Sequence, residues 1–219
     1  MTEPTAVVGD VHGEPERLRA ALDQVADGRR VILVGDYVDR GSDSRGVLEL
    51  LVATRRELAE RLVLLRGNHE VTLLEFLEGA PPDALVRHGG LRTVRSYVHQ
   101  PEVRVFEQFR RDFPPQHREL LESTVLCVDE PGLLVSHAGW DPSDPDGRSL
   151  RQMTLGAGGR VFDGAARPPK DLVVFGHFTQ SSGRPLVTPH LVCLDTGCGT
   201  SPQAPLTVLL LPEREIHQF

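Results

Sequence analysis

The chain has 219 residues, 39% of them hydrophobic, which is enough to form one α/β domain with a sizeable core. Its formal charge of −7 and isoelectric point near 5.7 argue against nucleic-acid and anionic-membrane partners, because both need a basic surface. Three irregularly spaced cysteines argue against a disulfide framework, and no apolar run reaches the roughly 20 residues that cross a bilayer. The first predicted strand begins by about Thr5, which leaves no room for a signal peptide, so we expect a cytoplasmic protein. We also expect it to be a monomer.

The first third of the sequence alternates between two patterns. Short apolar runs predict buried strands at Thr5–Gly9, Arg30–Gly35 and Arg61–Arg66. Between them, apolar residues at helical spacing predict helices at Glu14–Ala26 and Ser44–Ala59. This β-α-β-α-β order indicates parallel strands joined by right-handed crossovers.

The middle of the chain, from about residue 71 to 122, has a different character. It carries Pro-Pro and Gly-Gly pairs and two amphipathic stretches, Leu91–Val98 and Glu102–Arg111, so we expect a helical excursion that covers one side of a site. From Thr124 onward, closely spaced short strands favour antiparallel neighbours in a second sheet. These strands are predicted at Thr124–Val128, Leu133–Ser136, Leu172–Phe175, Pro185–Thr188, Leu191–Leu194 and Leu206–Leu211.

Five of the predicted strands run directly into Asp, Asn or His side chains. In open α/β sheets, ligands bind at the carboxyl ends of the strands, and carboxylates, amide oxygens and imidazoles are common ligands of divalent metals. The residues at these strand ends are Asp10, His12, Asp36, Asn68, His137 and His177. They predict a two-metal enzyme that hydrolyses phosphate esters.

A division of these ligands between two metals follows from their positions. Asp10 and His12 are two residues apart, so in an extended segment both point to the same side and can share one metal. Asp36 has two carboxylate oxygens and can bridge from that metal to a second one. The second metal would take Asp36, Asn68, His137 and His177. Two cations about 4 Å apart can clamp a phosphate and lower the pKa of a water between them.

The remaining roles go to residues beside these ligands. His69 follows the ligand Asn68 and is the predicted general acid that protonates the leaving oxygen, with Asp39 as its orienting partner. Arg40 and Arg66 flank the ligand loops, and a guanidinium can hold a phosphate through two hydrogen bonds.

Five short motifs occur in order along the chain: GDVHG (9–13), GDYVDRG (35–41), RGNHE (66–70), HAG (137–139) and GH (176–177). Together they resemble the phosphoprotein phosphatase family of metal-dependent serine/threonine phosphatases, of the bacterial type. The resemblance spans roughly residues 5 to 200, and three or more such motifs in order are a strong signal.

The resemblance implies a calcineurin-like α/β fold, in which two mixed sheets pack as a sandwich flanked by helices, formed here by a single metallophosphoesterase domain over residues 1–219. It implies two divalent metals, Mn²⁺ first with Fe or Zn as alternatives, and direct attack by metal-bound hydroxide. It places the metal ligands and the His69–Asp39 pair as assigned above. It also implies a third phosphate-binding arginine, for which Arg151 is the first choice and Arg148 and Arg160 are alternatives.

The expected activity is that of a metal-dependent phosphomonoester hydrolase, a serine/threonine protein phosphatase acting on phosphorylated proteins or small phosphoesters. A rival on the same fold is symmetrical cleavage of diadenosine tetraphosphate, but such relatives typically carry Ala where this chain has Asp39. A third reading is a non-catalytic module that binds phosphorylated partners. Such modules usually lack one or two ligands, and this chain has all six.

Overall fold

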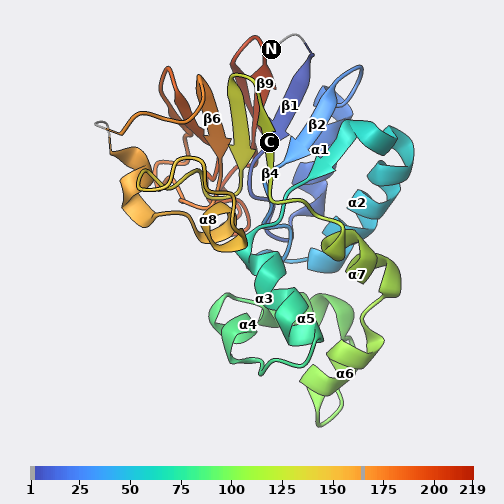
Figure 1. Ribbon diagram of the computed structural model, residues 1–219. Coiled ribbons are helices and arrows are strands. Elements are labelled where there is room, and N and C mark those ends of the chain that lie inside the picture. The colour runs from blue at the N-terminus through green and yellow to red at the C-terminus, as the bar shows by residue number, and fades with distance from the viewer. Residues whose placement is uncertain (1–2, 164–165) are drawn as a thin grey trace.

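The computed structural model describes residues 3–163 and 166–219 and shows two five-stranded sheets packed face to face (Figure 1). The first sheet has the strand order β10-β9-β1-β2-β3. The strands β1 (Thr5–Val8), β2 (Arg30–Leu33) and β3 (Leu62–Leu64) are parallel, as the sequence predicts. The strands β9 (Thr207–Leu211) and β10 (Glu215–Gln218) complete this sheet in antiparallel fashion.

The second sheet has the order β4-β5-β6-β8-β7 and is also mixed. Its strands are β4 (Cys127–Glu130), β5 (Leu133–Ser136), β6 (Leu172–Phe175), β7 (Leu186–Val187) and β8 (Leu191–Cys193). Only the outer pairs β4–β5 and β7–β8 are antiparallel, whereas β5, β6 and β8 are parallel.

Two expectations for the second half of the chain are therefore corrected. Antiparallel pairing is not general, because residues 137–171 and 176–190 are long enough to carry the chain back before the next parallel strand. The last predicted strand, Leu206–Leu211, does not join the second sheet. It forms β9 in the first sheet, where Val8 of β1 lies opposite Val208.

The core between the two sheets follows from the alternation of side chains along each strand. In β1, Val7 points into this interior, while Ala6 and Val8 point to the opposite face. In β6, Val174 points inward, and Val173 packs in a separate cluster on the outer face of the second sheet. Both faces of β1 and β6 are buried, which explains their continuous apolar sequences.

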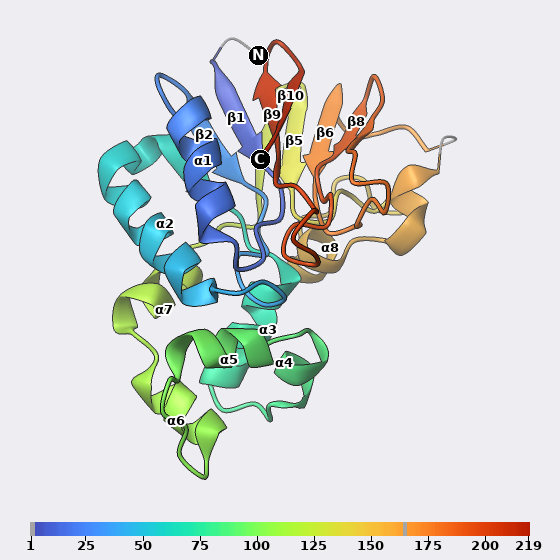
Figure 2. The same ribbon diagram turned by 180° about the vertical axis from the view of Figure 1, so that it is seen from behind.

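The outer face of the first sheet is covered by α1 (Pro15–Val25) and α2 (Ser44–Leu58), as Figure 2 shows. Helix α1 buries its predicted apolar stripe against the sheet, and Pro15 occupies its first turn, where its missing N–H costs no hydrogen bond. Helix α2 begins at a side-chain cap, because the Asp43 carboxylate accepts a hydrogen bond of 2.8 Å from the Gly46 N–H.

The helical excursion forms a lobe beyond the carboxyl ends of the strands (Figure 1). Its aromatic core contains Phe109, which stacks on Phe76 with ring centroids 5.9 Å apart and also contacts Tyr97 and Phe113. The helices are α3 (Asn68–Leu77), α4 (Asp83–Arg87), α5 (Leu91–Tyr97), α6 (Val105–Asp112) and α7 (Pro115–Glu122). The two helices expected here correspond to α5 and α6, and α3 begins at a predicted metal ligand.

Three short helical elements lie outside this lobe: η1 (Ala59–Arg61), α8 (Leu150–Leu155) and η2 (Gly158–Phe162). Helix α8 begins at a capping box, in which the Ser149 hydroxyl accepts from the Gln152 N–H and the Gln152 side chain accepts in return. None of the helices in the described ranges is long and apolar enough to cross a membrane.

Candidate metal centre

The structure brings the six predicted ligands to one place, just beyond the carboxyl ends of β1, β2, β3, β5 and β6. Asp36 lies at the centre of the group. Its Oδ2 is 3.5 Å from Nε2 of His12, and its Oδ1 is 3.4 Å from Nε2 of His137. Each oxygen of this carboxylate thus lies near a different histidine, which is the arrangement that a bridging ligand requires.

A compact group of three ligand atoms lies on the Oδ1 side of Asp36. The Asn68 Oδ1 is 3.0 Å from Nε2 of His137 and 2.9 Å from Nδ1 of His177, and these two nitrogens are 3.2 Å apart. With bonds of about 2.1 Å, neighbouring ligands at right angles around a cation lie about 3 Å apart. The observed spacing fits one divalent metal.

The tautomers of two histidines are fixed by the main chain. Nδ1 of His12 donates to the carbonyl of Val38 at 2.8 Å, and Nδ1 of His137 donates to the carbonyl of Val34 at 3.1 Å. Each ring therefore presents its unprotonated Nε2 to the centre, as metal-binding histidines usually do. Burial lowers the pKa of His12 to about 3 and that of His137 to about 4, so both rings are neutral near pH 7.

One buried atom supports the fit of a metal directly. Nε2 of His12 is buried and has no hydrogen-bond partner among the described residues, a condition that costs free energy unless something else binds there. A divalent cation would satisfy this nitrogen together with Asp36 and Asp10. The donor set of carboxylate, amide and imidazole is suited to Mn, Fe or Zn.

The buried carboxylates around Asp10 repel one another, and a cation bound among them would stabilise their charges. Asp10 accepts a hydrogen bond of 3.1 Å from the His177 N–H. Burial, followed by the charges of Asp195 and Asp36, raises the pKa of Asp10 well above its usual range. Asp195 is not among the predicted site residues, although it follows β8 as the other acidic residues follow their strands. It is held by the Thr179 hydroxyl at 2.7 Å.

His69 and Asp39 form the predicted pair. Nδ1 of His69 donates to Oδ2 of Asp39 at 2.7 Å, and both side chains are buried. Burial alone would lower the pKa of His69, but the charges of Asp36 and Asp39 outweigh it and raise the pKa above its usual value. The ring is therefore held by its Nδ1, and Nε2 is the atom that faces the centre.

Two hydroxyl groups that the sequence did not single out hold Asp39. The Thr93 hydroxyl donates to Oδ1 of Asp39 at 2.5 Å, and the Asp39 N–H donates to Thr93 and to Ser44 at 2.9 and 3.0 Å. Thr93 comes from α5, more than fifty residues along the chain. His88, another residue without a predicted role, also lies near the site, with its ring centroid 5.2 Å from that of His69.

Of the predicted phosphate-binding arginines, Arg40 lies at the centre. Its guanidinium is 3.3 Å from Nε2 of His69. The Arg66 guanidinium instead donates to the Thr124 hydroxyl at 2.8 Å and to the Glu122 carbonyl at 2.8 Å, at the end of α7.

The three candidates for a further arginine lie around α8 and differ in their contacts. Arg151 is exposed on the helix and has no side-chain partner among the described residues. Arg148 donates to Asp129 at 2.8 Å, and Arg160 lies 3.6 Å from Asp141. Arg151 is thus the candidate whose guanidinium is not already engaged.

Backbone conformation is unusual around this centre. Five non-glycine residues adopt left-handed φ angles, each at a cost of about 1–3 kcal/mol. They are His12 (φ 43°), Asp36 (54°), Asp39 (70°), Arg40 (60°) and His177 (63°). Concentration of strain at one site indicates that the placement of these side chains serves function rather than folding.

Two glycines allow the close approach of the strand ends. A Cβ at Gly67 would collide with Oδ1 of Asp36, and a Cβ at Gly176 would collide with Oδ1 of Asp10. The glycines of the RGNHE and GH motifs are therefore needed for the geometry of the neighbouring carboxylates.

Comparison with known proteins gives a consistent result. A family model described as calcineurin-like phosphoesterase matches residues 3–180. Among solved structures, a putative diadenosine tetraphosphatase is 21% identical with a TM-score of 0.72, and the match covers 100% of this chain and 94% of that one. A serine/threonine phosphatase from Saccharomyces cerevisiae with similarity to human phosphatase PP5 is 17% identical, with a TM-score of 0.64 and coverage of 99% and 79%.

A metallophosphoesterase from Sphaerobacter thermophilus is also similar, at 17% identity, a TM-score of 0.55 and coverage of 99% and 88%. At these identities the solved structures establish the fold of two sandwiched sheets but not the substrate.

Proposed function

The chain belongs to the calcineurin-like phosphoesterase family and is a phosphoester hydrolase, and from this premise we propose that it removes phosphate from phosphoserine and phosphothreonine in proteins. The observation that carries the proposal is the buried His69–Asp39 pair, with 2.7 Å between Nδ1 and Oδ2. A serine or threonine alkoxide is a poor leaving group, so its departure requires a proton donor held in place.

The metal assignments follow the grouping of the ligand atoms. We assign Asp10, His12 and Asp36 to one cation, and Asp36, Asn68, His137 and His177 to the other. When bound, two divalent cations supply a phosphate clamp and lower the pKa of a water molecule to near neutral. Mn²⁺ is our first choice, with Fe or Zn as alternatives, because the ligand types do not distinguish among them.

His69 is assigned to the leaving-group side of the reaction. Its Nδ1–H is used by Asp39, so a second proton on Nε2 is the one that can pass to the leaving oxygen. Asp39 favours the protonated ring, because its carboxylate is buried beside it and is itself held by Thr93. Arg40, 3.3 Å from the same Nε2, is placed to bind a phosphoryl oxygen while that proton is transferred.

The positions of the other two predicted arginines give less support for phosphate binding. Arg151 is free to turn toward a substrate from the exposed side of α8. Arg66 would first have to release Thr124 and Glu122 before it could bind phosphate. We therefore assign phosphate binding to Arg40 first, then to Arg151, and to Arg66 last.

The test compares kcat/KM on a phosphothreonine peptide and on diadenosine tetraphosphate, each with Mn²⁺ and with a chelator. The proposal expects metal-dependent turnover that is faster on the peptide. Much faster cleavage of the dinucleotide would assign the site to dinucleoside polyphosphates instead. Absence of metal-dependent turnover, even of p-nitrophenyl phosphate, would favour the binding-module alternative.

A further inference from the structure

A cavity of about 590 Å³ adjoins the metal centre, and apart from Arg40 none of the residues that line it has a role in the assignments above. Arg40 lines this cavity and also contacts His69, so one guanidinium joins the two places. Two glycines in its lining, Gly41 and Gly199, lie against the main chain of the ligand His12. A Cβ at either position would collide with the His12 carbonyl oxygen. The cavity is therefore built directly onto the ligand loop.

The charges in the lining favour an anion. Arg92, on the exposed side of α5, has no side-chain hydrogen bond or ion pair among the described residues. Among the described residues, the Arg40 side chain makes a hydrogen-bond contact only with the ring of His69. Glu14 is the one carboxylate in the lining. Two guanidinium groups and one carboxylate give the lining a local positive charge, on a chain whose net charge is −7.

The rest of the lining is unsuited to a nucleobase. It consists of hydroxyl and backbone groups from Ser42, Thr200 and Ser201, with Pro202 as the apolar contribution. Binding of adenine generally requires an aromatic or broad apolar surface for stacking. A carboxylate or phosphate on a flexible side chain needs only the guanidinium and a few hydrogen-bond donors.

We propose that this cavity is a subsite for an anionic side chain next to the phosphorylated residue, so that acidic phosphopeptides are the favoured substrates. The proposal rests on the protein phosphatase function proposed above. Arg40 holds the phosphate to be removed, and Arg92 binds the neighbouring anion. The two arginines come from different elements, the loop after β2 and helix α5, and the same helix holds Asp39 through Thr93.

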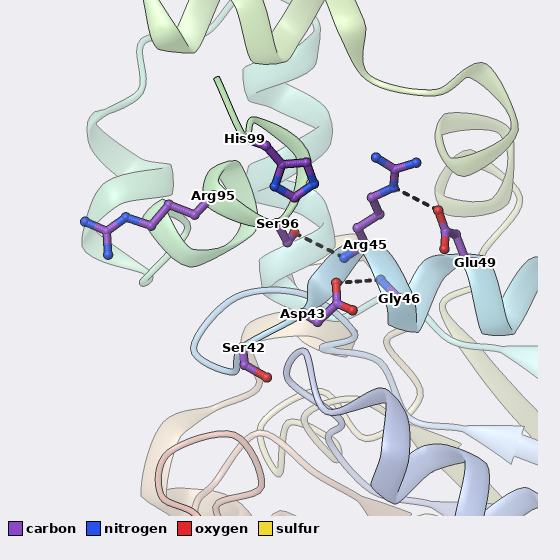
Figure 3. Close-up of a pocket in the computed structure, with 8 residues that line it drawn as sticks. All are labelled: Ser42, Asp43, Arg45, Gly46, Glu49, Arg95, Ser96 and His99. Carbon is purple, nitrogen blue, oxygen red and sulfur yellow. Dashed lines mark hydrogen bonds and ion pairs between the residues drawn. The ribbon is translucent and has the colours of Figure 1, made fainter. Parts of the chain in front are cut away.

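A second cavity, of about 550 Å³, shares Ser42 with the first and provides a contrast (Figure 3). Its arginine, Arg45, is neutralised by Glu49 at 2.8 Å, and Asp43 is occupied in capping α2. Arg95 extends away from this pair in the figure. Arg95 lies one turn after Arg92 on α5 and lines only this second cavity, so it is a matched control for the charge of the helix.

The experiment uses two phosphothreonine peptides that differ only in having Asp and Glu, or Asn and Gln, beside the phosphorylated residue. The quantity measured is the ratio of kcat/KM for the acidic peptide to that for the neutral one, at low ionic strength with saturating Mn²⁺. We expect a ratio of about 2 to 5 for the wild type, the range of one exposed charge pair. Arg92→Ala should bring the ratio close to 1, and Arg92→Glu should invert it.

Control variants distinguish an effect of charge within the cavity from an effect of the protein's overall charge. Arg95→Ala should keep the wild-type ratio. Ser201→Asp places a negative charge in the loop after β8, which lines the same cavity, without changing α5, and it should lower the ratio as Arg92→Ala does. Glu14→Gln should raise the ratio. An unchanged ratio in both Arg92→Ala and Ser201→Asp, or an equal loss in Arg95→Ala, would overturn the subsite.

The two proposals fail in different ways. Wild-type turnover of both peptides with a ratio near 1 would refute the subsite and leave the phosphatase function intact. No turnover of either peptide would refute the function and the subsite with it. If Arg92→Ala slowed only diadenosine tetraphosphate, the cavity would belong to a polyphosphate chain and the peptide proposal would be wrong.

Discussion

Replacement of His69 by Asn removes the proposed proton donor while keeping a side chain of similar polarity. In the wild type, Nδ1 of His69 donates to a buried carboxylate at 2.7 Å, and Nε2 is directed to the metal centre. Asn can still hydrogen-bond to Asp39, but it cannot give up a proton near neutral pH. The variant therefore removes proton donation while largely preserving the packing of the side chain.

The expected loss is large and depends on the leaving group. General acid catalysis contributes roughly 10²–10⁴-fold to a rate, which corresponds to about 2.7–5.4 kcal/mol of transition-state stabilisation. Because serine leaves as an alkoxide that must be protonated, His69→Asn should lower kcat on a phosphoserine peptide by that factor. The p-nitrophenolate anion leaves without a proton, so the loss on p-nitrophenyl phosphate should be much smaller.

The assay measures kcat on both substrates with saturating Mn²⁺ and, in parallel, the metal content of the variant. The metal measurement is needed because ligand atoms of His12, Asp36 and His69 all lie within 4.8 Å of one another, so geometry alone would allow His69 to bind a metal. We expect the variant to keep both cations. Equal losses on the two substrates, or loss of a cation, would refute the assignment of His69 as the acid.

Three further outcomes are expected. Thr93→Val removes the 2.5 Å hydrogen bond to Asp39, which as a bond to a charged group is worth about 1.5–3 kcal/mol, so kcat on a phosphopeptide should fall at least about tenfold with unchanged metal content. Mn²⁺ at about 100 times its Kd should stabilise the metal-free protein by about 2.7 kcal/mol and raise its Tm by roughly 5–10 °C, as followed by calorimetry; no shift would argue against a site in the folded state. Phe109→Ala, in the aromatic core of the helical lobe, should lower the free energy of unfolding in denaturant by about 3–5 kcal/mol; a loss below 1 kcal/mol would mean that the lobe does not depend on this core.

The parts of the structure that could be predicted are those marked by a pattern in a short stretch of the sequence. The apolar runs before Asp10, Asp36 and Asn68 predicted strands that end at the site, and the structure confirms the strands. The side-chain clustering follows, because parallel strands place their carboxyl ends at one edge. The two mixed sheets flanked by helices, which the resemblance to the phosphatase family implied, are also confirmed.

The parts that sequence did not predict depend on partners far apart in the chain. Nothing local distinguishes Leu206–Leu211, which joins the first sheet, from the strands of the second sheet. Thr93 holds Asp39 across more than fifty residues, and its own surroundings predict only an amphipathic helix. Arg66 was predicted from its place in the RGNHE motif, but its contacts with residues 121–124 depend on where α7 ends.

Asp195 is an intermediate case. It follows the predicted strand Leu191–Leu194, as the assigned ligands follow theirs, but no site role was predicted for it. The charge of Asp195 nonetheless helps to raise the pKa of Asp10. The rule that acidic residues at strand ends belong to the site, applied to β8 as well, would have found it.

We infer that two cations share Asp36, whose two oxygens lie 3.5 and 3.4 Å from the nitrogens of His12 and His137. Its most direct test is the metal content of the purified protein and of Asp36→Asn, after dialysis against Mn²⁺ and removal of free metal. We expect two equivalents per chain in the wild type and almost none in the variant, with activity lost in parallel. One equivalent or none in the wild type, or two in Asp36→Asn, would contradict it.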